Sequence, residues 1–254
     1  MRGKKRRRSP RRQNAVPDGG WIWGRHPVET ALANPARRIK RLLIAGEADK
    51  LTIPAGVTPE NAGKDEISDL LPPDAVHQGI ALLADPLPDL AIEDICAIPA
   101  EKPRSTIVIL DQVTDPHNVG AVLRSAAVFG ADAVILPDRN APPMTGTLAK
   151  SSSGAIESVP LIRVTNLVRA MESLKQAGYW CIGLDSEAGA SLETLKSSPY
   201  QAIALGAEGP GLRRLTRESC DDFCRIEATG PLHSLNVSNA AAVALFALTR
   251  QATD

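Results

Sequence analysis

The stretch STIVILDQVTDPHNVGAVLRSAAVFG, residues 105–130, joins a short apolar run to a helical pattern. The same alternation continues along the rest of the chain. Further strand-like runs are AVIL, SVPLIRV, YWCIGLD, QAIAL and FCRI, and the helical patterns are MTGTLAKSSSG, NLVRAMESLKQAG and GLRRLTRES. Short apolar strands that alternate with helices predict an α/β domain over residues 105–254, with a parallel sheet covered on both faces.

The last helical pattern, residues 235–251, consists mostly of Ala, Val, Leu and Phe. A helix this apolar must be buried. The pattern leaves two environments open for it, the core of the domain or the surface of a partner subunit.

A smaller unit precedes this domain, over residues 21–85. GRHPVETALAN and KDEISDLL are helical patterns, and IKRLLIAG and HQGIALLAD are strand-like runs. Pro27 is tolerated because it falls in the first turn of its helix. These runs predict a small α/β domain. Residues 86–104 are rich in proline and charge, and we predict a linker there.

The charge of the chain is distributed unevenly. The formal net charge of the 254 residues is zero, but the opening MRGKKRRRSPRR carries eight Lys and Arg and no acid. The remainder has 21 basic and 29 acidic residues. An arginine-rich block beside an acidic protein predicts that residues 1–20 are a disordered arm that contacts nucleic acid, although a solvated tail would have the same composition.

Several classes of protein are disfavoured by the sequence. No apolar run follows the arm as it would in a signal peptide, and none is long enough to span a bilayer. The four cysteines form no CxxC pair, and Cys220 with Cys224 would supply only two zinc ligands. We therefore expect a cytoplasmic protein with reduced thiols, no membrane contact and no metal site.

Polar residues follow three of the predicted strands, at the sheet edge where ligands bind in open α/β folds. The first strand ends at Asp111, and Asn118 then stands where a helix N-cap is expected. Arg124 lies two turns into that apolar helix. It either forms a salt bridge to an acid elsewhere in the chain or meets an anion or hydroxyl at the strand end.

The loop GAEGPGL, residues 206–212, follows the strand-like run QAIAL. It lacks the Gly-Lys-Ser/Thr of a phosphate-binding loop and the spacing of a dinucleotide fingerprint, so a nucleotide-binding regulator is disfavoured. Glu208 could accept hydrogen bonds from backbone donors or a ligand, or could be a surface acid in a turn.

The third segment is ATGPLHSLNVSNAAAVAL, residues 228–245. Ser234, Asn236, Ser238 and Asn239 stand at the start of the last helix, and four polar residues are more than one cap requires. His233 beside Ser234 suggests a hydrolase. Adjacent residues cannot easily meet as nucleophile and base, however, and the sequence has no GxSxG elbow.

Together and in this order, the three segments resemble a known family. Asn118 with Arg124 six residues on, then GAEGPGL, then SLNVSNAAAV resemble motifs one, two and three of the SpoU branch of RNA 2'-O-methyltransferases. This branch belongs to the SPOUT superfamily. The resemblance implies that the C-terminal domain contains a deep trefoil knot. GRHPVETAL and AVHQGIAL are similar to the RNA-binding N-terminal domain of members that methylate a guanosine ribose in 23S rRNA.

The resemblance implies S-adenosylmethionine as the cofactor. Gly206, Ala207 and Gly209 would let the backbone approach it closely, because a Cβ at Gly206 would obstruct that approach. Ile226 and Leu235 would supply apolar walls and main-chain contacts to adenine. No metal is implied, because the sulfonium is already activated.

The implied reaction is transfer of the methyl group to a ribose 2'-oxygen. The resemblance implies that Arg124 acts on this hydroxyl. A guanidinium with a pKa above about 12 is an awkward base, so we expect it to pair with the target phosphate and the developing alkoxide. Asn118, Glu208, Ser234 and Asn236 would fix Arg124 and the ribose.

Two further expectations follow from the resemblance. Family members are homodimers, with the last helix and the knot at the interface. The third motif departs from the family pattern at four positions. Glu227 and Ala228 stand within the usual Ile-Pro-Met-x-Gly, and His233 and Asn239 replace residues that are typically small or apolar. Because the core Ser-Leu-Asn is kept, we expect this departure to affect the choice of target more than activity.

Two alternatives to 23S rRNA methylation stay open. One is a methyltransferase for a tRNA ribose, although such members often lack the N-terminal domain. The other is a non-catalytic RNA-binding protein of ribosome assembly, which the presence of Arg124 and Asn236 disfavours.

Overall fold

The computed structural model describes residues 20–46, 51–139, 141–195, 198–232 and 234–251. Apart from Gly20, the arm predicted over residues 1–20 lies outside these ranges, and so does His233.

The N-terminal unit is a small α/β domain, as predicted. Its four-stranded sheet has the order β1-β4-β2-β3. The elements are β1 (Trp21–Trp23), α1 (Arg25–Ala33), β2 (Ile39–Ile44), β3 (Pro59–Asn61), α2 (Lys64–Asp69) and β4 (Ile80–Ala84). The two helices and two longer strands confirm the sequence patterns, whereas the three-residue strands β1 and β3 are too short to show a periodicity.

The C-terminal unit contains a seven-stranded sheet of order β7-β6-β5-β10-β8-β11-β9. Every strand pairing in it is parallel, which confirms the prediction. Its strands are β5 (Ser105–Asp111), β6 (Ala133–Pro137), β7 (Leu161–Val164), β8 (Trp180–Leu184), β9 (Ala190–Ser191), β10 (Tyr200–Gly206) and β11 (Asp222–Arg225). Its helices are α4 (Pro116–Val128), α5 (Gly146–Ser151), α6 (Leu167–Gln176), α7 (Arg214–Glu218) and α8 (Val237–Gln251), with the 3₁₀ helices η1 (Ala155–Glu157) and η2 (Leu192–Thr194).

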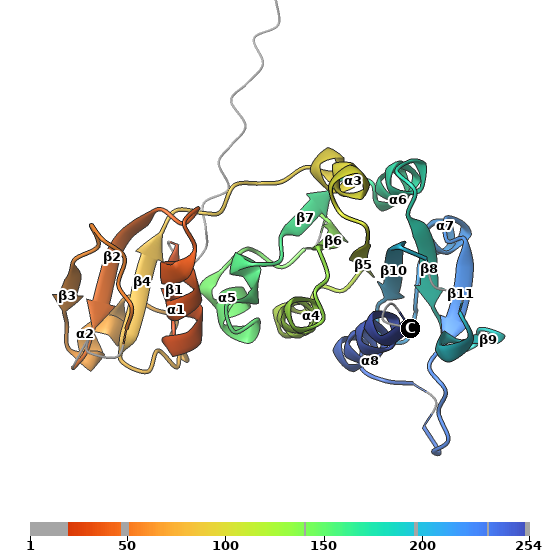
Figure 1. The fold of residues 1–254 in the computed structure, drawn as a ribbon. Coiled ribbons are helices and arrows are strands. Elements are labelled where there is room, and N and C mark those ends of the chain that lie inside the picture. Colours follow the sequence, from red (N-terminus) through yellow and green to blue (C-terminus); the bar gives the residue numbers. More distant parts are fainter. Residues whose placement is uncertain (1–19, 47–50, 140, 196–197, 233, 252–254) are drawn as a thin grey trace, which may run out of the picture.

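Helices cover both faces of this sheet (Figure 1). Val108 and Leu110 of β5 belong to a core shared with α4, α5 and α8, while Ile107 and Ile109 belong to a second core with α6. Successive residues of a strand point to opposite faces, so one apolar run supplies both cores.

Helix α8 is buried along one face, as its composition requires. Ala241, Ala244 and Leu245 are inaccessible or nearly so, whereas Val243 and Phe246 are exposed. The helix therefore packs into the core of the domain and also presents apolar side chains outward, where a partner subunit could cover them.

The segment predicted as a linker, residues 86–104, contains a further helix, α3 (Ile92–Glu101). Ile95 is buried in the core beneath α6. Pro99 lies inside this helix and has no N–H to donate to the carbonyl of Ile95. Tyr179 Oη lies 3.4 Å from that carbonyl and donates to it instead. Proline content therefore misled the prediction here, because a tertiary contact replaces the lost bond.

The two units pack against each other through β1 and α1 on one side and α5 and η1 on the other (Figure 1). A Cβ at Gly146 of α5 would lie 1.9 Å from the ring of Trp23, so only glycine allows this approach. Arg37 Nη2 lies 2.6 Å from Glu157 Oε1, and the two side chains are only 8% and 5% exposed. Asn34 Nδ2 also donates to Glu157, at 2.8 Å.

Replacing Glu157 with glutamine is expected to lower the free energy of unfolding by about 3 kcal/mol, because Arg37 would be left buried without its counter-charge. Urea denaturation followed by circular dichroism measures this change. Glu218→Gln is the matched control, because its pair with Arg214 is exposed and should contribute less than about 1 kcal/mol. Equal losses in the two variants would contradict a buried interdomain ion pair.

The four cysteines are free thiols in the structure. Burial raises the pKa of Cys181, Cys220 and Cys224 to about 12, so these three are protonated at neutral pH. Among the described residues, no helix has the length and apolar character needed to cross a membrane.

Candidate active site

The candidate residues lie where the strands of the large sheet end. β10 pairs with β5 along its whole length, and this register sets Gly206 beside Asp111. β11 ends one residue before Ile226, two strands away from β10 in the same sheet. The segments that follow β5, β10 and β11 therefore leave the sheet at one edge, as the parallel topology predicts.

The amide of Asn236 joins all three sequence segments. Its Nδ2 donates to Asn118 Oδ1 at 3.1 Å and to Glu208 Oε1 at 2.5 Å. Asn118 comes from the first segment and Glu208 from the glycine-rich loop. Three of the predicted catalytic residues thus form one hydrogen-bonded group, although they are up to 118 positions apart in the chain.

The orientation of this amide is fixed by the start of α8. Asn236 Oδ1 accepts from the backbone N of Ser238 at 2.9 Å and from its Oγ at 2.5 Å. Asn236 therefore caps the helix with its oxygen and directs its nitrogen toward Asn118 and Glu208. Ser234 and Asn239 are exposed, and the side chain of neither forms a hydrogen bond with a described residue.

The cap of α4 differs from the prediction. Asp115, not Asn118, is the N-cap, and its carboxylate accepts from His117 N at 3.0 Å. Pro116 takes the first helical position, which its fixed φ and missing N–H favour. Asn118 then falls within the first turn, where its side chain is available to Asn236.

Arg124 is exposed on α4. Its guanidinium forms no hydrogen bond or ion pair with any residue in the described part of the chain. The salt-bridge alternative considered from the sequence thus finds no acid among those residues. What remains is a cation available to an external anion or hydroxyl.

The loop GAEGPGL closes on itself. Gly211 N donates to Ala207 O at 2.9 Å, and Gly209 and Gly211 have φ of +83° and +69°, which only glycine adopts readily. A Cβ at Gly206 would lie 2.0 Å from the carbonyl carbon of Gly211. The close approach that requires Gly206 is thus to the loop's own backbone, whereas the resemblance ascribed it to the cofactor. Contact of this loop with a cofactor stays a prediction.

Comparison with known proteins agrees with this geometry. Residues 105–246 match the SpoU rRNA Methylase family, and residues 21–90 match the family described as RNA 2'-O ribose methyltransferase substrate binding. The 23S rRNA (guanosine-2'-O-)-methyltransferase RlmB of Vibrio cholerae is 40% identical over 238 residues, which cover 91% of this chain and 96% of that protein.

The chain belongs to the SpoU rRNA methylase family.

Two further relatives extend the comparison. The protein of the same name from Salmonella typhi is 41% identical over 243 residues, covering 91% of this SpoU chain and 98% of that protein. The crystal structure of the SpoU methyltransferase AviRb from Streptomyces viridochromogenes, in complex with the cofactor AdoMet, has a TM-score of 0.77 at 22% identity. It covers 95% of this chain and 94% of that one, and at this identity it shows the shared fold alone.

One pair in this SpoU site was not identified from the sequence. Asp111 is fully buried at the end of β5, and its carboxylate accepts from Arg213 N at 2.9 Å and from Arg213 Nε at 2.7 Å. Arg213 directly follows GAEGPGL, so the pair fastens the far end of the loop to β5. The fold had to be known, because the two residues are 102 positions apart.

Asp111→Asn is expected to loosen the loop, because the neutral asparagine amide would replace the charged carboxylate that binds the Arg213 guanidinium. Hydrogen exchange at Gly211 N should become about tenfold faster or more, while β5 itself stays protected. Arg214→Gln is the control, since Arg214 is exposed and, among the described residues, pairs with Glu218 alone. Unchanged exchange in Asp111→Asn would mean that the loop needs no such fastening.

The predicted apolar walls lie at the same edge of the SpoU domain. Ile226 is partly buried against the main core, whereas Leu235, two residues before α8, is 49% exposed. Leu232, which was not predicted, is 80% exposed. Glu227 of the atypical third motif forms an ion pair with Arg225 at 2.7 Å. Within the described ranges, no group of three or more His, Cys, Asp or Glu is arranged to hold a metal ion.

Proposed function

We propose that this SpoU protein transfers a methyl group from S-adenosylmethionine to the ribose 2'-hydroxyl of a guanosine in 23S rRNA. The observation that carries the proposal is the Asn236 amide, which unites the three motif segments at the ligand-binding edge of the sheet. The choice of target is supported by relatives of that name, which are about 40% identical over both domains.

The exposed surface at this edge suits the proposed cofactor. Leu232 and Leu235 expose apolar side chains there, and every residue of the 206–212 loop is at least partly exposed. An adenine ring needs apolar walls and main-chain partners, which these residues offer. Gly206, Ala207, Gly209, Ile226 and Leu235 would hold the cofactor, and S-adenosylmethionine supplies a methyl group already activated on a sulfonium.

In this proposal the side chains of the chain orient the ribose and stabilise its developing charge. Arg124 pairs with the target phosphate and with the alkoxide that forms at the 2'-oxygen. Asn118, Glu208 and Asn236 form a fixed hydrogen-bonding group that positions the sugar, and the Ser234 hydroxyl adds a contact. Because a guanidinium retains its proton at neutral pH, the hydroxyl proton passes to water as the methyl group moves from sulfur to the 2'-oxygen.

The N-terminal domain and the basic arm are assigned to substrate capture. Residues 21–90 match a family described as substrate binding, which supports the first assignment. The arm, residues 1–20, carries charge suited to phosphates and adds affinity that falls with salt. We assign the protein to the cytoplasm, because its proposed RNA substrate is found there.

We also propose a homodimer built on the knotted C-terminal domain. Support comes from an apolar surface on α4 and α8, where Val128, Val243 and Phe246 are exposed and Phe246 meets Phe129 edge-on at 5.9 Å. Exposed apolar patches of this kind are typical of subunit interfaces. The trefoil knot rests on family membership.

Methyl transfer from labelled S-adenosylmethionine to large-subunit rRNA and to tRNA tests the function. Label on one rRNA guanosine ribose is the expected result, located by nuclease digestion and mass spectrometry. Label on tRNA alone would keep the chemistry and overturn the substrate. Binding of rRNA without label, on free rRNA and on pre-ribosomal particles alike, would favour the assembly-factor alternative.

A further inference from the structure

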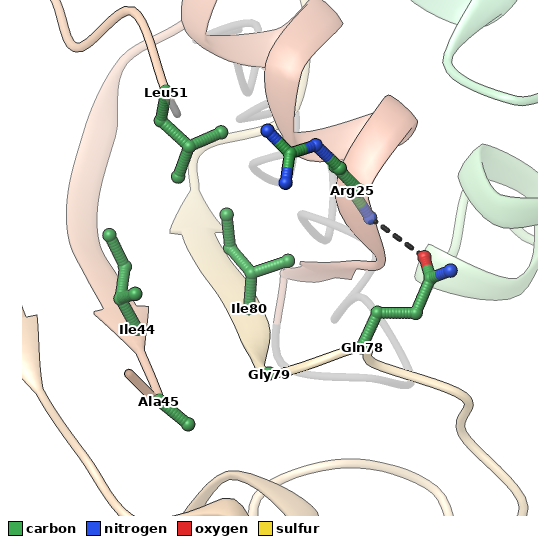
Figure 2. Close-up of a pocket in the computed structure, with 7 residues that line it drawn as sticks. All are labelled: Arg25, Ile44, Ala45, Leu51, Gln78, Gly79 and Ile80. Carbon is green, nitrogen blue, oxygen red and sulfur yellow. Dashed lines mark hydrogen bonds between the residues drawn. The ribbon is translucent and has the colours of Figure 1, made fainter. Parts of the chain in front are cut away.

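The N-terminal domain contains a pocket of about 240 Å³, far along the chain from the active-site motifs (Figure 2). The start of α1, the end of β2, the loop before β4 and the start of β4 line it, together with Leu51. The lining residues are Arg25, Ile44, Ala45, Leu51, Gln78, Gly79 and Ile80. An adjoining hollow lined by Lys64 and residues 75–79 shares Gln78 and Gly79 with it. The two hollows therefore lie next to each other along the loop that precedes β4.

The Arg25 side chain reaches across this pocket toward Leu51, above Ile80 (Figure 2). Its Nε donates to Glu29 Oε1 at 2.8 Å, which holds the guanidinium in position. A planar cation above aliphatic side chains offers one face to a flat ring. Unstacked RNA bases bind to Arg planes in this way.

Gln78 joins the pocket to the methyltransferase domain. Its Oε1 accepts from Arg25 N at 3.0 Å and from Lys150 Nζ of α5 at 3.2 Å. Its φ of +57° is a left-handed conformation that costs a non-glycine residue free energy. The structure keeps this strained residue at the point where the two domains meet beside the pocket.

Lys150 is a partly buried cation without a counter-ion among the described residues. Its ammonium lies so close to Gly24 that a Cβ there would be 2.3 Å from Nζ. Burial lowers the pKa of Lys150, and its hydrogen bond is to the neutral amide of Gln78. A phosphate bound at this position would supply the counter-charge that the Lys150 ammonium lacks.

The helix that carries Lys150 also supports the active site. Ser151, the next residue, donates to Pro116 O at 3.0 Å, in the turn that contains Asn118. A Cβ at Gly120 would lie 1.9 Å from the Ser151 hydroxyl, so α4 and α5 are in direct contact. A ligand at Lys150 would therefore rest on the same rigid unit that holds the catalytic segment.

We infer that this pocket takes one unstacked nucleotide of the RNA substrate, with its base against Arg25 and the aliphatic wall and its phosphate at Lys150. The inference rests on the proposed function for the identity of the RNA. It assigns Arg25, Gln78 and Lys150 to substrate recognition, at a distance from the reacting ribose.

Binding of a large-subunit rRNA transcript, measured by filter retention at several salt concentrations, tests the site without methyl transfer. Arg25→Lys keeps the charge and loses the planar face, so affinity should fall about tenfold with an unchanged salt slope. Lys150→Met should weaken binding and reduce the slope by about 0.7, the contribution of one phosphate. Lys40→Met is the control, because Lys40 lies in the same domain and pairs with Asp85.

Wild-type affinity in both pocket variants, or equal losses in all three variants, would overturn the inference. Cross-linking of 4-thiouridine-substituted rRNA to wild-type protein gives a readout that does not depend on the folding of a variant. The expected cross-links fall on residues 44, 45, 51 and 78–80. Cross-links confined to other peptides would also overturn it. If these results hold while no RNA is methylated, the pocket stands and the proposed function fails.

Discussion

Arg124→Ala is expected to reduce the rate of methyl transfer at saturating RNA and cofactor by about 10²- to 10³-fold, the usual effect of removing a group that stabilises developing charge. Folding should be unaffected. Arg124 is exposed and has no partner within the described residues, so its removal breaks no contact there. Surface substitutions of this kind change stability by about 0.5 kcal/mol or less.

Single-turnover kinetics with rRNA measure the expected loss of rate, and the melting temperature measures whether folding is unaffected. Arg124→Lys should retain part of the activity, because the charge is kept and the bidentate geometry is lost. Arg104→Ala is the matched control, since Arg104 is also exposed and has no partner in the described ranges. A variant Arg124→Ala with more than half of the wild-type rate would remove this residue from the mechanism.

Asn236→Asp is expected to lower the rate by about 10²-fold while leaving α8 folded. An aspartate still accepts from Ser238 and caps the helix, and a negative charge is favourable at that end. It has no donor for Asn118 or Glu208, and two carboxylates would face each other where the structure has a 2.5 Å hydrogen bond. The change therefore separates the catalytic contacts of this residue from its structural one.

The double variant Asn236→Asp with Glu208→Gln provides the decisive comparison. Reversing donor and acceptor restores the hydrogen bond, so the double variant should be more active than Asn236→Asp alone. Asn239→Asp, three residues along the same exposed turn, should retain the wild-type rate. Additive losses in the double variant would indicate that Asn236 and Glu208 do not act through their mutual bond.

The strands and helices of the large domain were predictable because their signal is local. TIVILD and QAIAL are apolar runs bounded by polar residues, and their alternation with helices predicts parallel pairing. The order of the strands in the sheet was not predicted. The strand Trp21–Trp23 is too short for such a signal. Helix α3 was missed because Pro99 is a helix breaker by composition, and only the contact with Tyr179 makes it tolerable.

The candidate site was predictable as a set of segments, through motifs whose order resembles that of the SpoU family. The hydrogen bonds and the ion pair within the site were not predictable. Asn236 caps its helix through the nearby Ser238, but it donates to Glu208 and Asn118, which are 28 and 118 positions away. The Asp111–Arg213 pair, likewise, consists of an ordinary strand-end acid and one of two adjacent arginines until the fold brings them together.

The contact between Gly206 and Gly211 has a thermodynamic consequence. Because the loop is already closed by its own backbone and fastened by Arg213, its conformation does not have to be selected when a ligand arrives. Preorganisation of this kind reduces the conformational entropy lost on association, so more of the contact energy is expressed as affinity. The same close contact limits substitution at residue 206. A single methyl group there would open the loop, and the loop would then lose conformational entropy when the ligand binds.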